Sequence, residues 1–166
     1  FFEAASPLRG RTSLEVRPHQ GKDVILWQLP PNLKQDISRL EGFLDLLPKN
    51  LPAGRQGFRH AFEFRHPSWV DDKTWKILRR YNVAVVFQDW KEWPQIREMT
   101  ADFVYLRFHG NRELYTSEYT EAELRAWADN IKKWLRQGKD VYAYFNNDAL
   151  GYAVPNARRF KELVEK

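Results

Sequence analysis

Short apolar segments with strand composition alternate with amphipathic, helix-like segments along this chain, and this alternation limits the fold more than any other feature. The strand-like segments recur at spacings of roughly 20 to 40 residues. Strands and helices that alternate in this way form parallel sheets through right-handed crossovers. The five expected strands are 24–29, 61–66, 83–88, 103–109 and 141–145.

Four segments have apolar residues at helical spacing and are expected to be helices. Ser68 precedes the second of them as a candidate N-cap. Thr120 followed by Glu123 has capping-box spacing at the start of the third, and Gly138 ends it. The expected helices are 37–47, 70–81, 120–137 and the segment from about 154 onward.

No Gly-x-Gly-x-x-Gly or phosphate-loop motif follows any strand, so a nucleotide-binding doubly wound sheet lacks its usual support. We expect instead an α/β fold, a parallel (β/α) barrel of the TIM type. A whole barrel has eight strands and about 250 residues. Five of the eight βα units are therefore expected here, with about three missing upstream of Phe1, and 1–166 is expected to be a single domain, the C-terminal two-thirds of the barrel.

Two stretches outside these elements also carry expectations. Residues 1–8 have the composition of the end of an apolar helix, and the polar, Arg-rich stretch up to Asp23 is expected to be a connection. Residues 49–57 contain two glycines and a proline and are expected to be a loop.

The second expected strand carries the charges that say most about function. Side chains alternate along a strand, so Phe62 and Phe64 face one side while Glu63 and Arg65 face the other. A parallel strand covered on both faces should be apolar throughout, so these charges require a polar interior. The alternative is a salt bridge that only fixes this strand beside its neighbour.

The other strands repeat this polar face. Arg107 and His109 share a face of the fourth strand, and Tyr144 and Asn146 share a face of the fifth. Because functional groups of a barrel collect at the carboxyl ends of its strands, we expect one shared site there. The candidate catalytic residues are Glu63, His109 and Asp148, and the candidate ligand-binding residues are Gln28, Arg65, His66, Trp69, Asp89, Arg107, Tyr144, Asn146 and Asn147.

Several of these candidates have a structural alternative. His66 can simply cap its strand and Asp89 the segment that follows it, and the run 146–148 is rich in turn-forming residues. Aromatic residues in strand-end loops can stack on bases or sugar rings, or simply pack in the loop. The aromatic residues in question are Trp69, Trp90, Trp93, Tyr115 and Tyr119.

Composition gives only broad limits on partners and location. The formal net charge of +5 and the pI near 9.5 favour an anionic partner. The basic residues are scattered, however, and can equally lie on solvent-exposed helix faces without binding a partner. The absence of cysteine excludes disulfides and thiolate metal sites. No apolar run approaches the roughly 18 residues of a membrane span, so we expect no membrane association and a cytoplasmic location. The sequence does not predict the oligomeric state.

Four motifs in this order resemble those of the YecE-like family, also known as domain of unknown function seventy-two. The motifs are Gln28-Leu29-Pro30-Pro31-Asn32, Phe62-Glu63-Phe64-Arg65-His66-Pro67-Ser68-Trp69, Tyr105-Leu106-Arg107-Phe108-His109-Gly110 and Tyr144-Phe145-Asn146-Asn147-Asp148. The resemblance covers nearly the whole chain and implies a (β/α) barrel whose first strands precede Phe1. It implies no established reaction, although a likeness of the family's mouth to metal-dependent DNA repair endonucleases has been suggested. The chain departs from the family at 53–57, an apparent insertion at the opposite end of the barrel from the site.

Three functions remain open at this point. The first is binding or hydrolysis of a phosphate-containing ligand, nucleic acid included, with Arg65 and Arg107 on phosphate and Glu63 or His109 as acid or base. The second is a carbohydrate-active hydrolase with Glu63 and a second carboxylate. The third is a non-catalytic ligand-binding module.

The cofactor is unknown. A divalent metal would need several ligands on one ion, and no His-Glu-x-x-His spacing is present, so a metal site depends on help from the missing strands. The side chains that could coordinate a metal are His66, His109, Glu63, Asp89 and Asp148.

Overall fold

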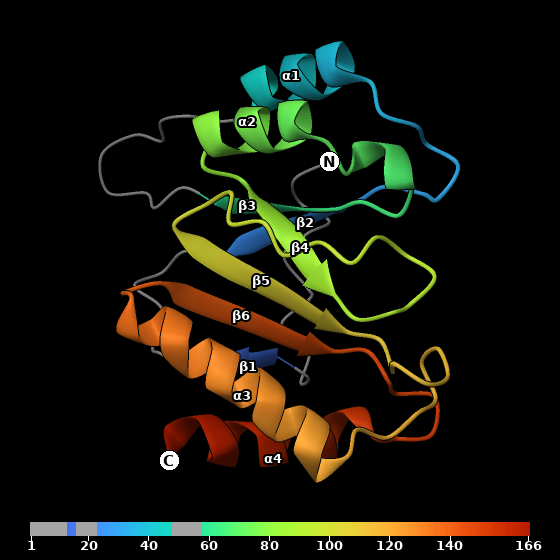
Figure 1. Ribbon diagram of the computed structural model, residues 1–166, viewed down its shortest axis with the longest axis vertical. Helices are drawn as coiled ribbons and strands as arrows, with labels where there is room; N and C mark the ends of the chain where they lie inside the picture. Colours follow the sequence, from blue (N-terminus) through green and yellow to red (C-terminus); the bar gives the residue numbers. More distant parts are fainter. Residues whose placement is uncertain (1–12, 16–22, 48–57) are drawn as a thin grey trace.

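Strands and helices alternate along the chain in the computed structural model, which describes residues 13–15, 23–47 and 58–166 (Figure 1). The strands are β1 (Ser13–Glu15), β2 (Val24–Gln28), β3 (Arg59–Glu63), β4 (Ala84–Gln88), β5 (Phe103–Phe108) and β6 (Asp140–Phe145). The helices are α1 (Ile37–Leu46), α2 (Asp72–Arg80), α3 (Glu121–Arg136) and α4 (Ala153–Glu165), with a short 3-10 turn at Pro67–Trp69.

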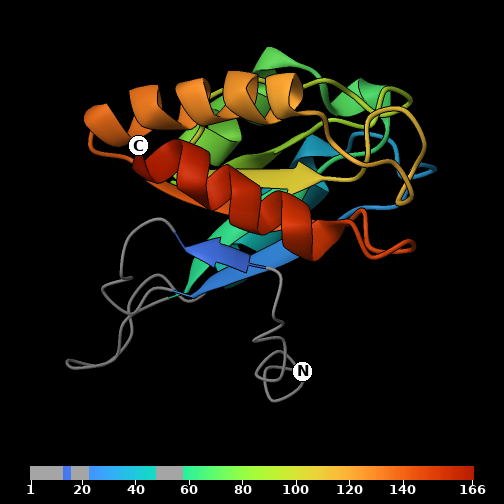
Figure 2. The same cartoon turned by 90° about the horizontal axis from the view of Figure 1, so that it is seen from below.

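The strands form one sheet in the order β1-β6-β5-β4-β3-β2. From β2 to β6 each strand lies parallel to its neighbour in sequence, and these five parallel strands curl into part of a barrel (Figures 1 and 2). The expected α/β fold of the TIM-barrel type is therefore confirmed. Among the connections that join the parallel strands β2 to β6, the one at 89–102, between β4 and β5, has no helix in the described residues.

β1 was not expected, because it lies in the stretch that the sequence indicates as a connection. It pairs antiparallel with β6, Leu14 lying opposite Ala143. A strand of three residues is too short for its side-chain alternation to be recognised in the sequence. It forms because the edge of β6 offers backbone groups with which it can pair.

The ends of two elements differ from the sequence expectation. β3 ends at Glu63 rather than at residue 66, and the 3-10 turn follows before α2 begins. Ser68 does not cap α2; the side chain of Asp71 does, accepting a hydrogen bond from the backbone N–H of Lys73. The Ser68 hydroxyl instead accepts from the backbone N–H of Gln35, 2.8 Å away, and so ties the loop after β2 to the turn.

The third expected helix is confirmed in detail. The Thr120 hydroxyl accepts from the backbone N–H of Glu123, whose carboxylate accepts in turn from the backbone N–H of Thr120 at 2.7 Å. After α3, Gly138 adopts a φ of 77°, the left-handed conformation that commonly follows a helix end. The expected helix at 1–8 and the insertion at 53–57 lie outside the described residues.

The two faces of the sheet bury different side chains. The helices cover one face of the sheet (Figure 2). Large apolar side chains of that face pack against them. The inner face holds a smaller cluster of buried side chains. The outer core includes Phe62, Phe64, Val85, Phe87, Leu106, Phe108 and Phe145 with Leu44, Leu78, Ile131 and Phe160, and the inner cluster is Ala61, Ala84, Val86, Phe103, Tyr105 and Tyr142.

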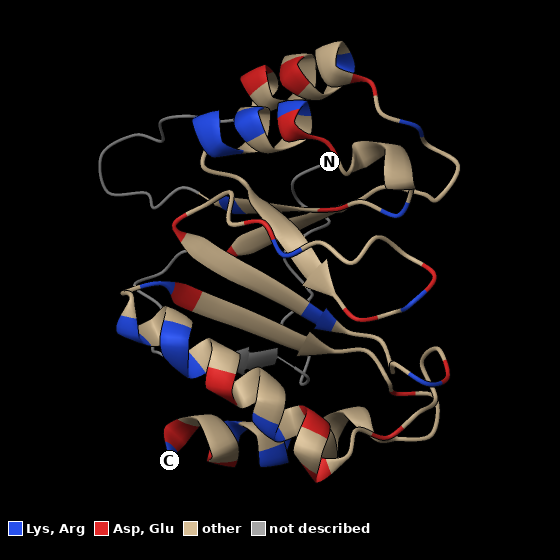
Figure 3. Cartoon of the chain, in the orientation of Figure 1, with Lys and Arg blue, Asp and Glu red and all other residues tan. Residues whose placement is uncertain are grey.

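Charged residues of both signs lie mostly on helices and connections, as expected for solvated faces (Figure 3). The strands carry few charges, and the clearest basic position on a strand is near the tip of β5, which ends Arg107–Phe108 (Figure 3). Among the residues described, no helix is both long enough and apolar enough to cross a bilayer.

Candidate functional site

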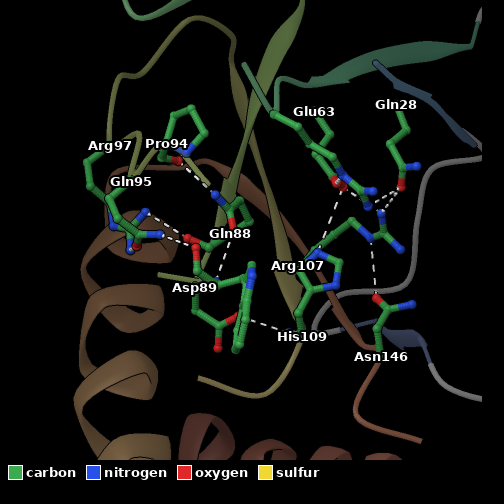
Figure 4. Close-up of polar contacts among 12 residues, drawn as sticks. Gln28, Glu63, Gln88, Asp89, Pro94, Gln95, Arg97, Arg107, His109 and Asn146 are labelled. Atoms are coloured by element: carbon green, nitrogen blue, oxygen red, sulfur yellow. Dashed lines mark hydrogen bonds and ion pairs between the residues drawn. The ribbon is translucent and has the colours of Figure 1, made fainter. Parts of the chain in front are cut away.

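Polar side chains from β2, β3, β5 and β6 meet at the carboxyl ends of the parallel strands. The register places Gln28 beside Glu63 and Arg107 beside Tyr144, and the alternation of side chains directs Glu63 and Arg107 to the inner face. Asn146 follows β6 and completes the group (Figure 4). We call this group, Gln28, Glu63, Arg65, Arg107 and Asn146, the mouth cluster.

The carboxylate of Glu63 lies at the centre of the mouth cluster and is fully buried, with 0% of its surface exposed. Its Oε1 accepts a hydrogen bond from Nε of Arg65 at 2.9 Å, and its Oε2 accepts from Nη1 of Arg107 at 2.5 Å. One negative charge is thus shared by two guanidinium groups. The side chains of both arginines are 13% exposed, so the excess positive charge reaches the solvent.

Neutral groups hold both arginines in place. The side-chain oxygen of Gln28 accepts from Arg65 at 2.8 Å and from Arg107 at 2.9 Å, and Asn146 accepts from Nε of Arg107 at 3.3 Å. The guanidinium of Arg65 also lies over the ring of Trp93, 3.8 Å from its centroid, which is a cation–π contact. Arg65 donates through Nε and Nη2, and Arg107 through Nε and Nη1. Among the described residues, Nη1 of Arg65 and Nη2 of Arg107 have no hydrogen-bond partner, so each keeps donors for a ligand.

His109 lies beside the mouth cluster and is completely buried. Its Nε2 is 3.9 Å from Oε2 of Glu63, beyond hydrogen-bond distance, and neither ring nitrogen has a partner among the described residues. Burial first, and then the positive charges of Arg107 and Arg65, lower the pKa of His109 to about 3. His109 is therefore a neutral imidazole at physiological pH.

A second group of contacts holds the backbone of β5 and its following loop (Figure 4). Asp89 accepts from the backbone N–H of His109 at 2.8 Å and from the hydroxyl of Tyr119, which in turn accepts from the backbone N–H of Gly110 at 2.7 Å. Burial raises the pKa of Asp89 above its usual value, an effect that its hydrogen bonds oppose. Both carboxylate oxygens of Asp89 are thus engaged in positioning the chain at His109.

Four of the sequence candidates lie away from the mouth cluster. His66 caps the 3-10 turn by accepting from the backbone N–H of Ser68, and Trp69 is 2% exposed, stacked on Phe64 in the outer core. Asn147 is buried and donates to the side-chain oxygen of Asn156 at 2.8 Å. Asp148 is exposed in the turn after β6.

Tyr144 lies near the mouth cluster on the inner face, and its ring stacks on that of Tyr105 with 4.8 Å between centroids. Burial is the main cause that raises the pKa of Tyr105. Trp93 and Tyr115, which the sequence offers only as loop aromatics, both contact His109 edge to face, at 5.0 and 5.7 Å between centroids. In the sequence, only their position in strand-end loops indicated that they could lie near the site, because irregular loops have no regular alternation of side chains.

The described residues contain no group of three or more His, Cys, Asp or Glu side chains placed to hold one metal ion. Near the mouth, Glu63 is bound to two arginines and Asp89 to a tyrosine and a backbone N–H. A metal would therefore have to displace these partners or use ligands from elsewhere.

Comparison with known proteins gives a consistent set of relatives. UPF0759 protein YunF of Bacillus subtilis (strain 168) is 27% identical over 136 residues, which are 63% of this chain and 46% of that protein. The crystal structure of a DUF72 family protein from Thermotoga maritima MSB8 superposes with a TM-score of 0.75 at 29% identity, covering 87% of this chain and 58% of that one. A DUF72 family protein from Enterococcus faecalis V583 has the same fold, with a TM-score of 0.74 at 17% identity, covering 86% of this chain and 58% of that one.

The chain therefore spans about half of the length of these relatives. The family model described as "Protein of unknown function DUF72" matches residues 2–166. This match includes all the motifs that carried the resemblance and all the strands that form the mouth. The chain belongs to the DUF72 family.

Proposed function

We propose that the mouth cluster binds the phosphate group of a ligand through Arg65 and Arg107. The observation that carries this proposal is that two guanidinium groups share one buried carboxylate, which leaves an excess of positive charge at the barrel mouth. Guanidinium groups match phosphate oxygens in geometry and bind them through charge-assisted hydrogen bonds.

The arginines are already held in one arrangement without a ligand. Glu63 and Gln28 bind both of them, and Trp93 supports the face of Arg65. Stacking on a ring leaves the N–H groups at the edge of the guanidinium plane available as donors. Little side-chain freedom is then lost on binding, so more of the interaction energy contributes to affinity.

Binding is better supported than hydrolysis. Glu63 is buried between two cations, and Asp148 is exposed in the turn after β6. His109, with its pKa lowered to about 3, is a weak proton acceptor near neutral pH. The carbohydrate alternative needs a second free carboxylate near Glu63, and Asp89 is committed to Tyr119 and the backbone of His109.

Calorimetric titration with inorganic phosphate tests the proposal. Arg107→Gln removes the charge and the free donor but keeps a polar side chain of moderate length, and we expect affinity to fall at least about tenfold because a charge-assisted pair is lost. The matched control is Arg79→Gln on α2, since Arg79 is half exposed and paired with Glu98. Equal affinities of the wild type and Arg107→Gln would contradict the proposal.

Nucleic acid is one phosphate-containing ligand, and titration with single-stranded DNA tests it with the same variants. We expect single-stranded DNA, if it binds at the mouth, to show an affinity that falls between about 50 and about 200 mM salt and that depends on Arg107. Salt-sensitive binding that persists in Arg107→Gln would place DNA on the scattered basic residues of the helices instead.

The other sequence expectations stay predictions. They are a single domain over 1–166, a cytoplasmic location and a divalent metal that depends on ligands from the strands expected upstream of Phe1. The oligomeric state has no prediction.

A further inference from the structure

Gln88 ends β4 in the same layer of the barrel as the mouth cluster. Side chains alternate along the strand, so Gln88 shares the inner face with Ala84 and Val86, and the register sets it beside Arg107. Its side chain is only 1% exposed. A buried amide at this position needs an explanation, because an apolar side chain would fill the same space without losing hydrogen bonds to water.

The side chain of Gln88 holds the loop that follows β4. Its Nε2 donates to the carbonyl of Pro94 at 2.8 Å (Figure 4), and its Oε1 accepts from the backbone N–H of Trp90 at 2.9 Å. This loop belongs to the connection 89–102, which has no helix whose own hydrogen bonds could order it. Side-chain bonds from the end of β4 therefore fix its backbone at two points.

Trp93 lies between these two points of attachment. Its N–H donates to the carbonyl of Trp90 at 3.1 Å. Its ring lies against the guanidinium of Arg65, with 3.8 Å from the guanidinium carbon to the ring centroid, and meets His109 edge to face. The place of the indole, and with it the cation–π contact, thus depends on a loop whose backbone Gln88 holds on both sides.

We propose that Gln88 is a positioning residue for the anion site: it fixes the loop that carries Trp93, and Trp93 fixes the plane of Arg65. Glu63 and Gln28 hold Arg65 through Nε and Nη2 at the edge of the guanidinium, whereas the indole supports its face. Without the ring, the guanidinium gains freedom to tilt, and this freedom is lost again when a phosphate binds. The effect on phosphate affinity rests on the proposed anion site, and the effect on the Arg65 side chain does not.

Calorimetric titration with inorganic phosphate measures the effect on binding. Gln88→Met keeps a side chain of similar length and removes both hydrogen bonds. We expect its phosphate affinity to fall about three- to tenfold, the cost of ordering one long side chain, and Trp93→Leu to cause the same loss. Because both substitutions act through Arg65, the double variant should bind no more weakly than either single variant. Losses that multiply in the double variant, or an unchanged affinity in Gln88→Met, would overturn the proposal.

NMR of the Arg65 side chain without any ligand gives a readout that a general loss of stability does not move. Protons that lie over an indole ring are shifted upfield by its ring current. We expect the side-chain signals of Arg65 to be upfield in the wild type and to return to ordinary positions in Gln88→Met and in Trp93→Leu. An upfield shift that survives in Gln88→Met would refute the proposal. A shift that is lost in Gln88→Met, in a protein that does not bind phosphate, would overturn the anion site and leave the positioning of Arg65 standing.

Thr100→Val is the matched control. Thr100 is buried in the same connection, and its hydroxyl bonds the backbone of Val83 and Val85 at the opposite end of β4. The control therefore also loses two hydrogen bonds to the backbone, but not those that hold Trp93. We expect its Arg65 signals and its phosphate affinity to match the wild type. A loss of affinity as large as that of Gln88→Met would assign the effect to a weakened β4 and refute the proposal.

If Gln88→Met does not fold, hydrogen exchange of the wild-type protein decides the matter. The backbone N–H of Trp90 is expected to be protected, because Gln88 accepts its hydrogen bond. Exchange of this N–H as fast as in an unfolded chain would show that Gln88 does not hold the loop.

Discussion

Acid should destabilise this protein through His109. The groups that face its ring are Glu63 from β3, Arg65 from the following loop, Arg107 from β5 and the phenol of Tyr115, and burial together with the two arginines lowers the pKa to about 3. In the unfolded chain the pKa returns to about 6.5. Between these two values only the unfolded state binds the proton. The stability that the neutral ring contributes is therefore fully present above about pH 6.5 and is lost as the pH falls toward 3.

The size of this effect follows from the two pKa values. One proton taken up on unfolding lowers the free energy of unfolding by about 1.4 kcal/mol for each pH unit. Since the unfolded histidine is already half protonated at pH 6.5, the loss between about pH 6.5 and about pH 4.5 is about 2 kcal/mol. This is a large share of the stability of a typical domain.

Urea unfolding of the wild type and of His109→Phe at these two pH values isolates the contribution of His109. Asp89, whose pKa is raised, and His60, whose pKa is lowered by burial, titrate in both proteins and cancel in the comparison. We expect the wild type to lose about 2 kcal/mol more than the variant over this range. Equal losses would refute the conclusion that His109 is held neutral in the folded protein, and so would a ring that titrates near pH 6.5 by NMR.

Two further substitutions test other parts of the account. Glu63→Gln leaves two guanidinium groups without their shared carboxylate, so we expect the free energy of unfolding to fall by about 2–4 kcal/mol in thermal or urea unfolding. The affinity for inorganic phosphate is expected to rise, because the carboxylate no longer neutralises the arginines. Unchanged stability would mean that Glu63 does not hold both arginines in place. Thr100→Val keeps the shape of a buried side chain whose hydroxyl donates to the carbonyl of Val83 and accepts from the N–H of Val85, both at 2.8 Å. A loss of about 1–3 kcal/mol is expected, and a loss under about 0.5 kcal/mol would show that this bridge contributes little.

The sequence predicts the mouth cluster well where the strand period applies. The alternation of side chains alone assigns Glu63 and Arg107 to the inner face, and the parallel order of the strands brings them to one end of the barrel. The helical period predicts α1 and α3 equally well, because both have a regular apolar stripe behind a capping residue.

Contacts that depend on irregular segments could not be predicted. The stacking of Arg65 on Trp93 and the bond from Tyr119 to Asp89 both require loops that bend back over the strand ends. Irregular segments also explain why some residues that the sequence predicts for the site lie outside the mouth cluster. Trp69 follows its strand closely in sequence, yet the 3-10 turn carries it into the outer core, where it packs on Phe64.

The central claim is that Arg65 and Arg107 form an anion site at the barrel mouth, and NMR of the arginine side chains tests it most directly. During a titration with inorganic phosphate, the Nε–H signals of Arg65 and Arg107 are expected to shift and to saturate together, while that of Arg79 on α2 stays in place. Signals of the two mouth arginines that do not move, or that move no more than that of Arg79, would contradict the claim.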